Sequence, residues 1–201
     1  MANKVSIYTD GSCDNLRHPN YGGWAYVIIE DGVAIEEDAG CGTHTTNNRM
    51  ELTAILFSLL NLPYFTSVTI YTDSQYCIGV LTKKYRAQAN LDLIEQFFEI
   101  VEEKSLDVSF EWVKGHSGNK WNEKVDKMAN DAFFKISGYD ITDYKRLQQD
   151  KEYKKQVYKE SKDDIRNKEI ADILKIFAEE TKVTNKLLDW GIHQINKLFK
   201  S

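Results

Sequence analysis

Acidic residues beside turns and helix starts are the part of this 201-residue sequence that is best placed to do chemistry. Asp10 lies at the end of a first strand-like segment, and Asp73 lies at the end of a later one. Glu51 is expected in the first turn of a helix, and Asp126 in the first turns of another, ten residues after His116. Strand ends next to turns are where a sheet exposes side chains to a cleft. If the two strands are parallel neighbours, the carboxylates of Asp10 and Asp73 lie side by side.

Grouped carboxylates need a positive partner, because each one raises the pKa of the next. A bound divalent cation would become the largest charge in such a site. Oxygen-only ligands suit Mg²⁺ or Mn²⁺ better than zinc. Two such ions, roughly 4 Å apart, would activate a water and stabilise the leaving oxygen of a phosphodiester.

Each of these residues, taken singly, also has an ordinary interpretation. An Asp at a strand end is usually a turn or cap residue, and Glu51 is a favourable charge near a helix start. His116 alone would be a solvated loop histidine. The combination of all of them favours a site.

The elements that must position these residues fill residues 1–138. Alternating and β-rich segments predict strands, and three- and four-residue spacing of apolar residues predicts helices. Asp31-Gly32 is a hairpin turn signal between the second and third strands, and Asn48 with Glu51 is a helix start signal. We predict an α/β fold with a mixed sheet flanked by helices. The predicted strands are 5–10, 24–30, 33–41, 68–73 and 108–113, and the predicted helices are 48–60, 74–81, 91–103 and 122–136.

Composition changes after Gly138. Residues 139–201 carry no strand pattern and are dense in Lys, Asp and Glu. Two apolar stripes at helical spacing predict amphipathic helices, so we expect an α-helical extension that is separate from the first 138 residues. Its stripes require burial on each other, on the first part, or on a partner or second copy. The stripes are Ile170, Ile173, Leu174 and Phe177, and Leu188, Ile192, Ile195 and Phe199.

The net charge of −5 argues against a broad basic face that grips nucleic acid without sequence preference. Residues 1–138 hold 12 Lys and Arg against 19 Asp and Glu, a net charge of −7, whereas residues 139–201 hold 14 against 12, a net charge of +2. Three dispersed cysteines fit a reduced compartment, and neither an apolar signal region nor a membrane span is evident. We therefore expect a cytoplasmic protein that does not associate with a membrane.

Four segments of residues 1–138 resemble type 1 ribonuclease H, in the order and with the spacing of that family. They are Thr9-Asp10-Gly11-Ser12-Cys13, Thr45-Thr46-Asn47-Asn48-Arg49-Met50-Glu51-Leu52, Thr72-Asp73-Ser74-Gln75-Tyr76, and Trp112-Val113-Lys114-Gly115-His116-Ser117-Gly118 followed by Asn122-Glu123 and Asp126. One such segment alone would be weak. Together they cover about two thirds of the chain and are specific.

The resemblance implies a ribonuclease H-like five-stranded fold and an endonuclease that cuts the RNA strand of RNA–DNA hybrids, leaving 5′-phosphate and 3′-hydroxyl ends. It implies that Asp10, Glu51, Asp73 and Asp126 bind two Mg²⁺ ions, for which Mn²⁺ could substitute. His116 would assist proton movement or product release. By the same resemblance, Asn48 and Gln75, with Asn15 as a looser match, would contact the 2′-hydroxyls of the RNA strand. Thr46 and Asn90 would form a phosphate pocket for the DNA strand, although helix capping is the simpler interpretation of Thr46 and Asn48.

The sequence departs from the family pattern in three places. The loop from Asp14 to Gly22 is somewhat long, which is why Asn15 is only a looser match. His44 stands where an arginine often supports the phosphate pocket, which predicts a weaker or pH-sensitive pocket. The stretch between Ile78 and Leu91 is short and has only three basic residues, Lys83, Lys84 and Arg86, where some members carry a longer basic protrusion.

Two other functions stay open on the sequence alone. One is a related nuclease that acts on DNA junctions or single strands, and the Thr-Thr-Asn-Asn-Arg-Met-Glu segment and the His116 loop argue against it. The other is a non-catalytic nucleic-acid-binding module, which the presence of all four carboxylates disfavours.

Overall fold

The computed structural model describes residues 5–14 and 20–137. Its elements follow the order β1 (Val5–Cys13), β2 (Tyr21–Glu30), β3 (Val33–Thr43), α1 (Asn47–Leu60), β4 (Ser67–Thr72), α2 (Gln75–Leu81), α3 (Leu91–Glu103), β5 (Asp107–Trp112) and α4 (Lys120–Ser137). The predicted extension after residue 138, with any partner or second copy that it binds, lies outside the described residues, and so does Asn15.

The five strands form one mixed sheet in the order β3-β2-β1-β4-β5. β1 pairs antiparallel with β2 and parallel with β4, and β4 pairs parallel with β5. The predicted hairpin turn between β2 and β3 is confirmed, since Asp31 and Gly32 both adopt positive φ, at 50° and 78°. The mixed sheet predicted from the sequence is therefore correct.

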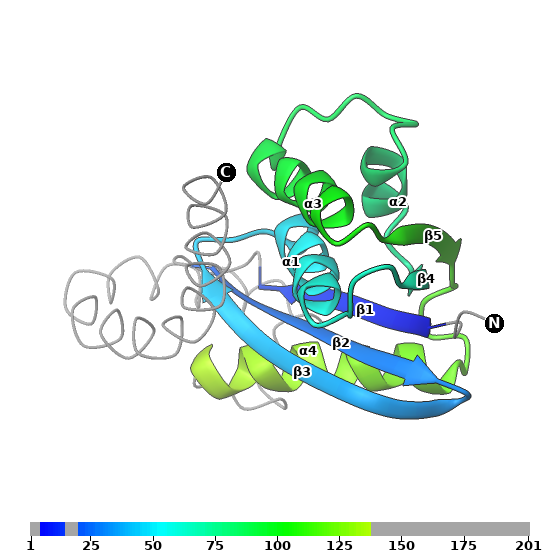
Figure 1. Cartoon of the computed structure of the whole chain (residues 1–201). Coiled ribbons are helices and arrows are strands. Elements are labelled where there is room, and N and C mark those ends of the chain that lie inside the picture. Colours follow the sequence, from blue (N-terminus) through cyan, green and yellow to red (C-terminus); the bar gives the residue numbers. More distant parts are fainter. Residues whose placement is uncertain (1–4, 15–19, 138–201) are drawn as a thin grey trace, which may run out of the picture.

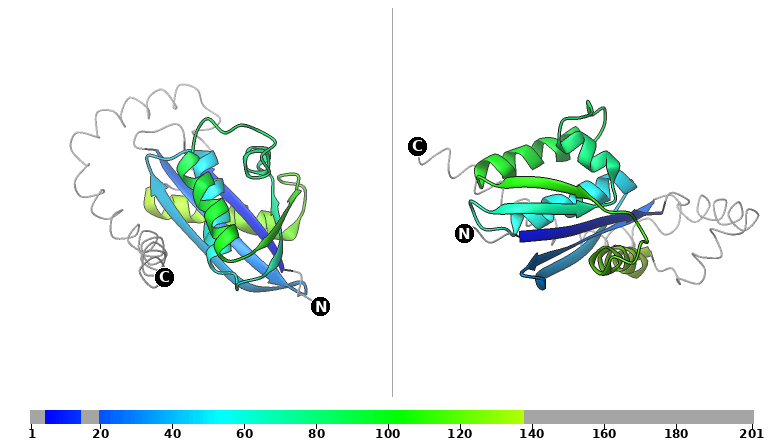
Figure 2. Two further views of the ribbon diagram at one scale, coloured as in Figure 1. Left: turned by 45° about the horizontal axis from the view of Figure 1, so that its top comes forward. Right: turned by 90° about the vertical axis from the view of Figure 1, so that its right-hand side faces the viewer.

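Helices cover both faces of this sheet (Figure 1). α1 and α3 lie on one face with α2 beside them, and α4 lies on the other face, as the side view in Figure 2 also shows. The larger apolar core is on the α1 side, where the rings of Trp24 and Phe57 stack at 4.5 Å between centroids. The smaller core joins Ala25 and Val27 of β2 to Val125 and Ala129 of α4. Full burial of one such aliphatic side chain contributes about 1.5–3 kcal/mol.

Three predicted boundaries are wrong in ways that matter for the site. β1 continues to Cys13, because residues beyond Asp10 keep pairing with β2, so Asp10 lies inside the strand. α1 begins at Asn47 after the N-cap Thr46, which makes Asn48 a helical residue and places Glu51 in the second turn. α4 begins at Lys120, before the predicted start at Asn122.

None of the helices in the described residues combines the length and the apolar content that crossing a membrane requires.

Candidate active site

The parallel pairing of β1 and β4 places Asp10 beside Asp73. The register pairs Tyr8 with Tyr71. Asp10 comes two residues after Tyr8, and Asp73 comes two residues after Tyr71. The two tyrosine rings stack at 4.6 Å between centroids with only 10° between their planes, so the strands are aligned on this face. Because side chains i and i+2 of a strand share a face, Asp10 lies on the same side as Tyr8. The expected pairing of the two carboxylates is supported by this register.

Glu51 reaches the same edge because α1 crosses β1 at very short range. A Cβ added to Gly11 would lie 2.3 Å from the backbone nitrogen of Glu51, closer than any side chain allows. Glycine at position 11 therefore permits the second turn of α1 to lie directly on β1 next to Asp10.

Three side chains hold the Glu51 carboxylate. Asn47 donates to Oε1 at 2.8 Å, and Ser74 donates to Oε2 at 2.5 Å. The Cys77 thiol also points at Oε2, at 3.8 Å. Ser74 is in addition the N-cap of α2, where its hydroxyl accepts from the backbone N–H of Cys77. The orientation of Glu51 is thus fixed from both α1 and α2.

Asp126 comes from the opposite face of the sheet, on α4. The Asn119 side chain accepts from the backbone nitrogens of Trp121 at 3.0 Å and Asn122 at 3.1 Å and so caps the start of this helix. One turn beyond Asp126, Asn130 donates to its carboxylate Oδ1 at 3.0 Å. Asp126 remains half-buried, with its other oxygen, Oδ2, 4.0 Å from His116 Nδ1.

The segment before α4 brings His116 to this edge. The His116 side chain is 83% exposed, and its backbone has a positive φ of 51°. Gly115 packs against Asp73, since a Cβ there would lie 2.6 Å from Oδ2 of that carboxylate. Asp73 is also fixed through its backbone, whose carbonyl accepts from Trp112 Nε1 at 3.2 Å.

Burial and mutual repulsion raise the pKa of three of these carboxyl groups. The pKa of Asp10 lies well above its ordinary value of 3.8, first because of burial and then because of the charges of Asp73, Asp126 and Glu51. Burial, and then the neighbouring carboxylates, also raise the pKa values of Glu51 and Asp73. Within residues 5–14 and 20–137, no lysine or arginine forms an ion pair with any of the four acids. Among the described residues, the cluster therefore has no lysine or arginine as a partner.

This donor set fits hydrated divalent ions. In the part of the chain that the structure describes, no three Asp, Glu, His or Cys side chains already form a closed ligand shell. Mg²⁺ does not need such a shell, because it keeps several waters and binds through one or two carboxylates together with substrate phosphates. An oxygen-only set that shares a buried negative field matches that preference.

The residues expected to contact nucleic acid lie around the start of α1 and the loop before α3. Thr46 is the N-cap of α1, and its hydroxyl accepts from the backbone nitrogen of Arg49 at 3.3 Å. Asn90 precedes α3 with a φ of 56°, and its side-chain oxygen accepts from Arg49 Nη1 at 3.3 Å. Arg49 thus links the two residues expected at the phosphate pocket. Asn48 is half-buried on α1, and Gln75 is exposed at the start of α2.

Arg49 is fixed by a second partner. Its guanidinium forms two hydrogen bonds with Asp92, at 3.0 and 2.7 Å, and this pairing lowers the pKa of Asp92. The Asn90 amide in turn donates to the hydroxyl of Tyr76 at 3.0 Å. His44, where the family often has arginine, is exposed with a φ of 52°.

Sequence reasoning missed four residues that fix the site: Asn47, Ser74, Arg49 and Asn130. Asn47 and Asn130 each lie four residues from the carboxylate that they hold, and i,i+4 spacing on a helix is a signal that could have found them. Ser74 and Arg49 act across elements, so no local spacing marks their roles.

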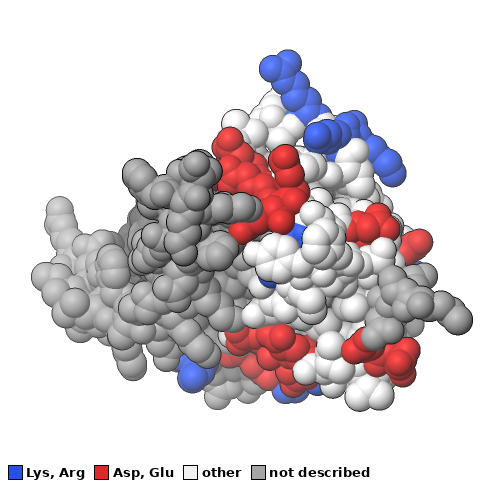
Figure 3. All heavy atoms as spheres, in the orientation of Figure 1, with Lys and Arg blue, Asp and Glu red and all other residues white. Residues whose placement is uncertain are grey.

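The exposed basic residues of the short α2–α3 connection form a small group. Figure 3 shows positive side chains gathered at the top of the view, over this connection. Lys83, Lys84 and Arg86 are all exposed there, which agrees with the short basic segment expected from the sequence.

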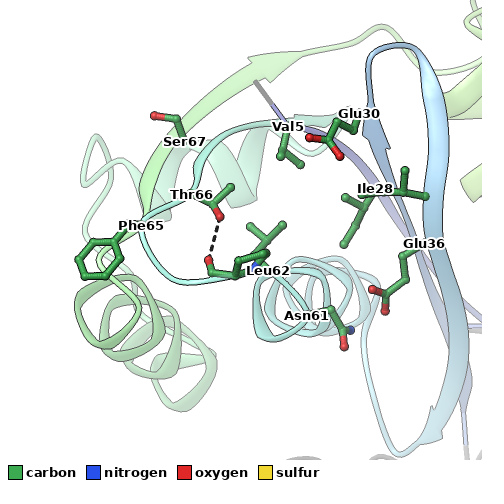
Figure 4. Close-up of a pocket in the computed structure, with 11 residues that line it drawn as sticks. Val5, Ile28, Glu30, Glu36, Asn61, Leu62, Phe65, Thr66 and Ser67 are labelled. Carbon is green, nitrogen blue, oxygen red and sulfur yellow. Dashed lines mark hydrogen bonds between the residues drawn. The ribbon is translucent and has the colours of Figure 1, made fainter. Parts of the chain in front are cut away.

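A cavity of about 440 Å³ lies at the other end of the sheet. Figure 4 shows Val5 and Leu62 on its apolar side, with Glu30 and Glu36 nearby. Because β1 begins at Val5 and β4 begins at Ser67, this cavity is at the strand starts, away from the four carboxylates.

Comparisons with known proteins agree with this arrangement. The family model described as RNase H matches residues 2–134. The chain is 36% identical over 141 residues to a ribonuclease H of Campylobacter jejuni, covering 66% of this chain and 93% of that protein. It is 37% identical over 149 residues to a ribonuclease H of Francisella philomiragia, covering 68% and 95%.

Solved structures share the fold at lower identity. LC11-RNase H1, in complex with an RNA/DNA hybrid, has a TM-score of 0.57 and 21% identity, over 65% of this chain and 97% of that chain. The N-terminal RNase H domain of a Mycobacterium tuberculosis protein has a TM-score of 0.54 and 22% identity, over 66% and 94%.

Proposed function

This chain belongs to the ribonuclease H family, and we propose that it is an endonuclease that hydrolyses the RNA strand of RNA–DNA hybrids with the help of divalent metal ions. The observation that carries the proposal is the group of four carboxylates at one edge of the sheet. Three of them have raised pKa values, and none of the four is paired with a lysine or arginine of the described residues. Grouping four carboxylates without a basic partner destabilises the folded protein, and a protein that kept the fold without the activity would have no use for such a group.

Asp10, Glu51, Asp73 and Asp126 would hold two Mg²⁺ ions, with Mn²⁺ as a possible substitute. Asp10 is the most central of the four, because its pKa responds to the charges of all three others. When bound, the two ions supply an activated water and charge stabilisation for the leaving oxygen, which gives 5′-phosphate and 3′-hydroxyl ends. The carboxylates orient the ions, and Asn47 and Ser74 keep Glu51 in position.

His116 would move a proton or assist product release at the exposed edge of the site. Its Nδ1 lies 4.0 Å from Asp126 Oδ2, and the ring is open to solvent. Because a proton can also leave through water, we expect His116 to contribute less than Asp10 or Asp73.

Strand discrimination would depend on polar side chains on both sides of the carboxylates. Asn48, Gln75 and, outside the described residues, Asn15 would contact the RNA strand through its 2′-hydroxyls. Thr46 and Asn90 would bind a phosphate of the DNA strand. Contacts with Arg49 support this pocket, because Asn90 accepts from the Arg49 guanidinium while Thr46 accepts from the backbone nitrogen of the same residue.

A cleavage assay tests the proposal. The full chain is incubated with end-labelled RNA–DNA hybrid, double-stranded RNA and double-stranded DNA, each with Mg²⁺ and with EDTA. We expect Mg²⁺-dependent cutting of the RNA strand in the hybrid only. Asp10→Asn should lower kcat about 10³-fold or more, since the lost charge stabilisation amounts to several kcal/mol and each 1.4 kcal/mol is about tenfold.

Asp131→Asn is the matched control, because Asp131 is an exposed acid on α4 that pairs with Lys127. It should leave kcat unchanged. Equal cutting of duplex DNA, or full activity of Asp10→Asn, would reject the proposed function.

A further inference from the structure

Asn130 connects the fourth carboxylate to the first strand. Its side-chain nitrogen donates to Asp126 Oδ1 at 3.0 Å and to the Asp126 carbonyl at 2.8 Å. Its side-chain oxygen accepts from the hydroxyl of Ser12 on β1 at 2.8 Å. Both ends of the Asn130 amide are therefore engaged, and the amide cannot rotate without losing bonds at both ends.

The bonding pattern gives the two oxygens of Asp126 different environments. Oδ1 accepts from Asn130, whereas Oδ2 is the oxygen that faces His116 at 4.0 Å. Ser12 and Asp10 are two residues apart on β1, so their side chains share the face that α4 covers. β1 thus carries both Asp10 and the Ser12 hydroxyl, which bonds to Asn130, the residue that in turn bonds to Asp126.

We propose that Asn130 is a positioning residue that, anchored by Ser12, turns Asp126 Oδ2 toward the metal-binding edge. This inference rests on the proposed function. Asp126 needs such a device because it comes from α4, on the face of the sheet opposite to α1 and Glu51, and because it is less buried than Asp10 and Glu51. Partners that orient a ligand in this way commonly change metal affinity or activity by about 10–100-fold when they are removed.

A merely structural role is the competing explanation. An Asn side chain that bonds to the carbonyl four residues earlier is an ordinary helix feature, and the bond to Ser12 would help to hold α4 on β1. That role predicts a loss of stability and no change in the response to Mg²⁺. The two roles therefore differ in what Mg²⁺ titration reveals.

The test compares Asn130→Ala with the neighbouring control Asp131→Asn in the full chain. Steady-state cleavage of the hybrid gives kcat, KM and the Mg²⁺ concentration for half-maximal activity. The rise in Tm on addition of Mg²⁺, without nucleic acid, reports metal binding independently of cleavage. For Asn130→Ala we expect kcat to fall about 10–100-fold and the half-maximal Mg²⁺ concentration to rise about tenfold, with KM for the hybrid within about twofold.

Ser12 supplies a second and milder pair of variants. Ser12→Ala should shift kcat and the Mg²⁺ response in the same direction but several-fold less, because Asn130 keeps its bonds within α4. Ser12→Thr, which retains the hydroxyl, should restore both. The double variant Ser12→Ala/Asn130→Ala should match Asn130→Ala alone, since Ser12 acts through Asn130.

An Asn130→Ala protein with a lower Tm but an unchanged kcat and Mg²⁺ response would overturn the inference. If that variant does not fold, the contrast between Ser12→Ala and Ser12→Thr decides, and identical Mg²⁺ responses would overturn the inference. If the wild-type protein cuts no hybrid while Asn130→Ala still weakens the Mg²⁺-induced rise in Tm, the inference stands and the proposed function fails.

Discussion

A charged side chain lies at each end of α1, and the two charges differ in whether the surrounding groups stabilise or oppose them. At the C-terminal end, the ammonium of Lys104 donates to the carbonyl oxygens of Leu60 and Leu62 at 2.6 Å each, and to that of Leu59 at 3.4 Å. These carbonyls belong to the last turn of the helix and the residues after it, where the helix dipole is negative. Burial lowers the pKa of Lys104, but its charge has partners inside the protein.

Near the N-terminal end, Glu51 points into a group of acids. Its hydrogen-bond donors, Asn47 and Ser74, are neutral, and its charged neighbours are also negative. Where a buried charge holds the fold together, the protein provides the partner. Under the proposed function, the partner of Glu51 is a divalent cation that comes from solution. The two ends of α1 thus differ in whether the described residues supply an oppositely polarised partner for the charge.

The largest stability effect is expected from Lys104→Met. This change removes the ammonium but keeps most of the side-chain volume, so the carbonyls at the end of α1 lose their donor. Loss of such bonds costs about 1–3 kcal/mol. Urea denaturation should show this loss of unfolding free energy, while kcat per folded molecule stays at the wild-type value.

Lys84→Met is the matched control, because Lys84 is exposed and lies outside the carbonyl cluster. An equal loss of stability in both variants, or a fall in kcat specific to Lys104→Met, would break the contrast between the two ends of α1.

At the carboxylate end, removing a charge is expected to increase the free energy of unfolding when no metal is present. A carboxyl group whose folded-state pKa is raised contributes stability below its unfolded pKa and loses it as pH rises through the folded value. For Asp10, Glu51 and Asp73 this loss begins above their ordinary values of 3.8 to 4.5. With EDTA at about pH 8, Asp10→Asn should therefore be more stable than wild type by about 1 kcal/mol, a typical size for a single substitution.

The gain should shrink toward about pH 4.5, where the carboxyl groups begin to take up protons, and Mg²⁺ should reverse it by stabilising only the wild type. Urea denaturation at both pH values, with EDTA and with Mg²⁺, measures the difference in unfolding free energy between Asp10→Asn and the wild type. A destabilised Asp10→Asn protein in EDTA at the higher pH would show that the carboxylate already has a partner within the protein.

The smallest effect is expected from Asp92→Asn. Arg49 and Asp92 lie at the same end of the molecule as Glu51 but are partly exposed, and exposed ion pairs contribute about 0.2–1 kcal/mol. Loss of the pair frees the guanidinium that bonds to Asn90, so KM for the hybrid should rise about two- to threefold, which corresponds to roughly 0.5 kcal/mol. kcat should not change. A tenfold fall in kcat with an unchanged KM would place this pair in the chemistry and not in substrate binding.

The sequence predicted the sheet well because strand and helix patterns are local. The range 91–103 predicted for α3 agrees with the structure, and the Asp31-Gly32 turn forms as expected. The spacing of four short motifs was enough to single out Asp10, Glu51, Asp73 and Asp126.

What could not be predicted depends on contacts across elements. β1 continues past Asp10 because residues of β2 pair with it, which no pattern within β1 reveals. The capping interpretation is confirmed for Thr46 and not for Asn48, since two polar residues near the helix start could both serve and only the folded chain selects one. The bond from Ser12 to Asn130 joins residues 118 positions apart, so only the folded chain displays it.

The absent side chain of Gly11 also limits how this site can change over time. Because the backbones of β1 and α1 meet there without a spacer, the separation between Asp10 and Glu51 is inherited from main-chain packing. Any larger residue at position 11 would lift the helix and carry one acid away from the other. Mutational drift can therefore retune the periphery of the site far more freely than the gap between these two acids.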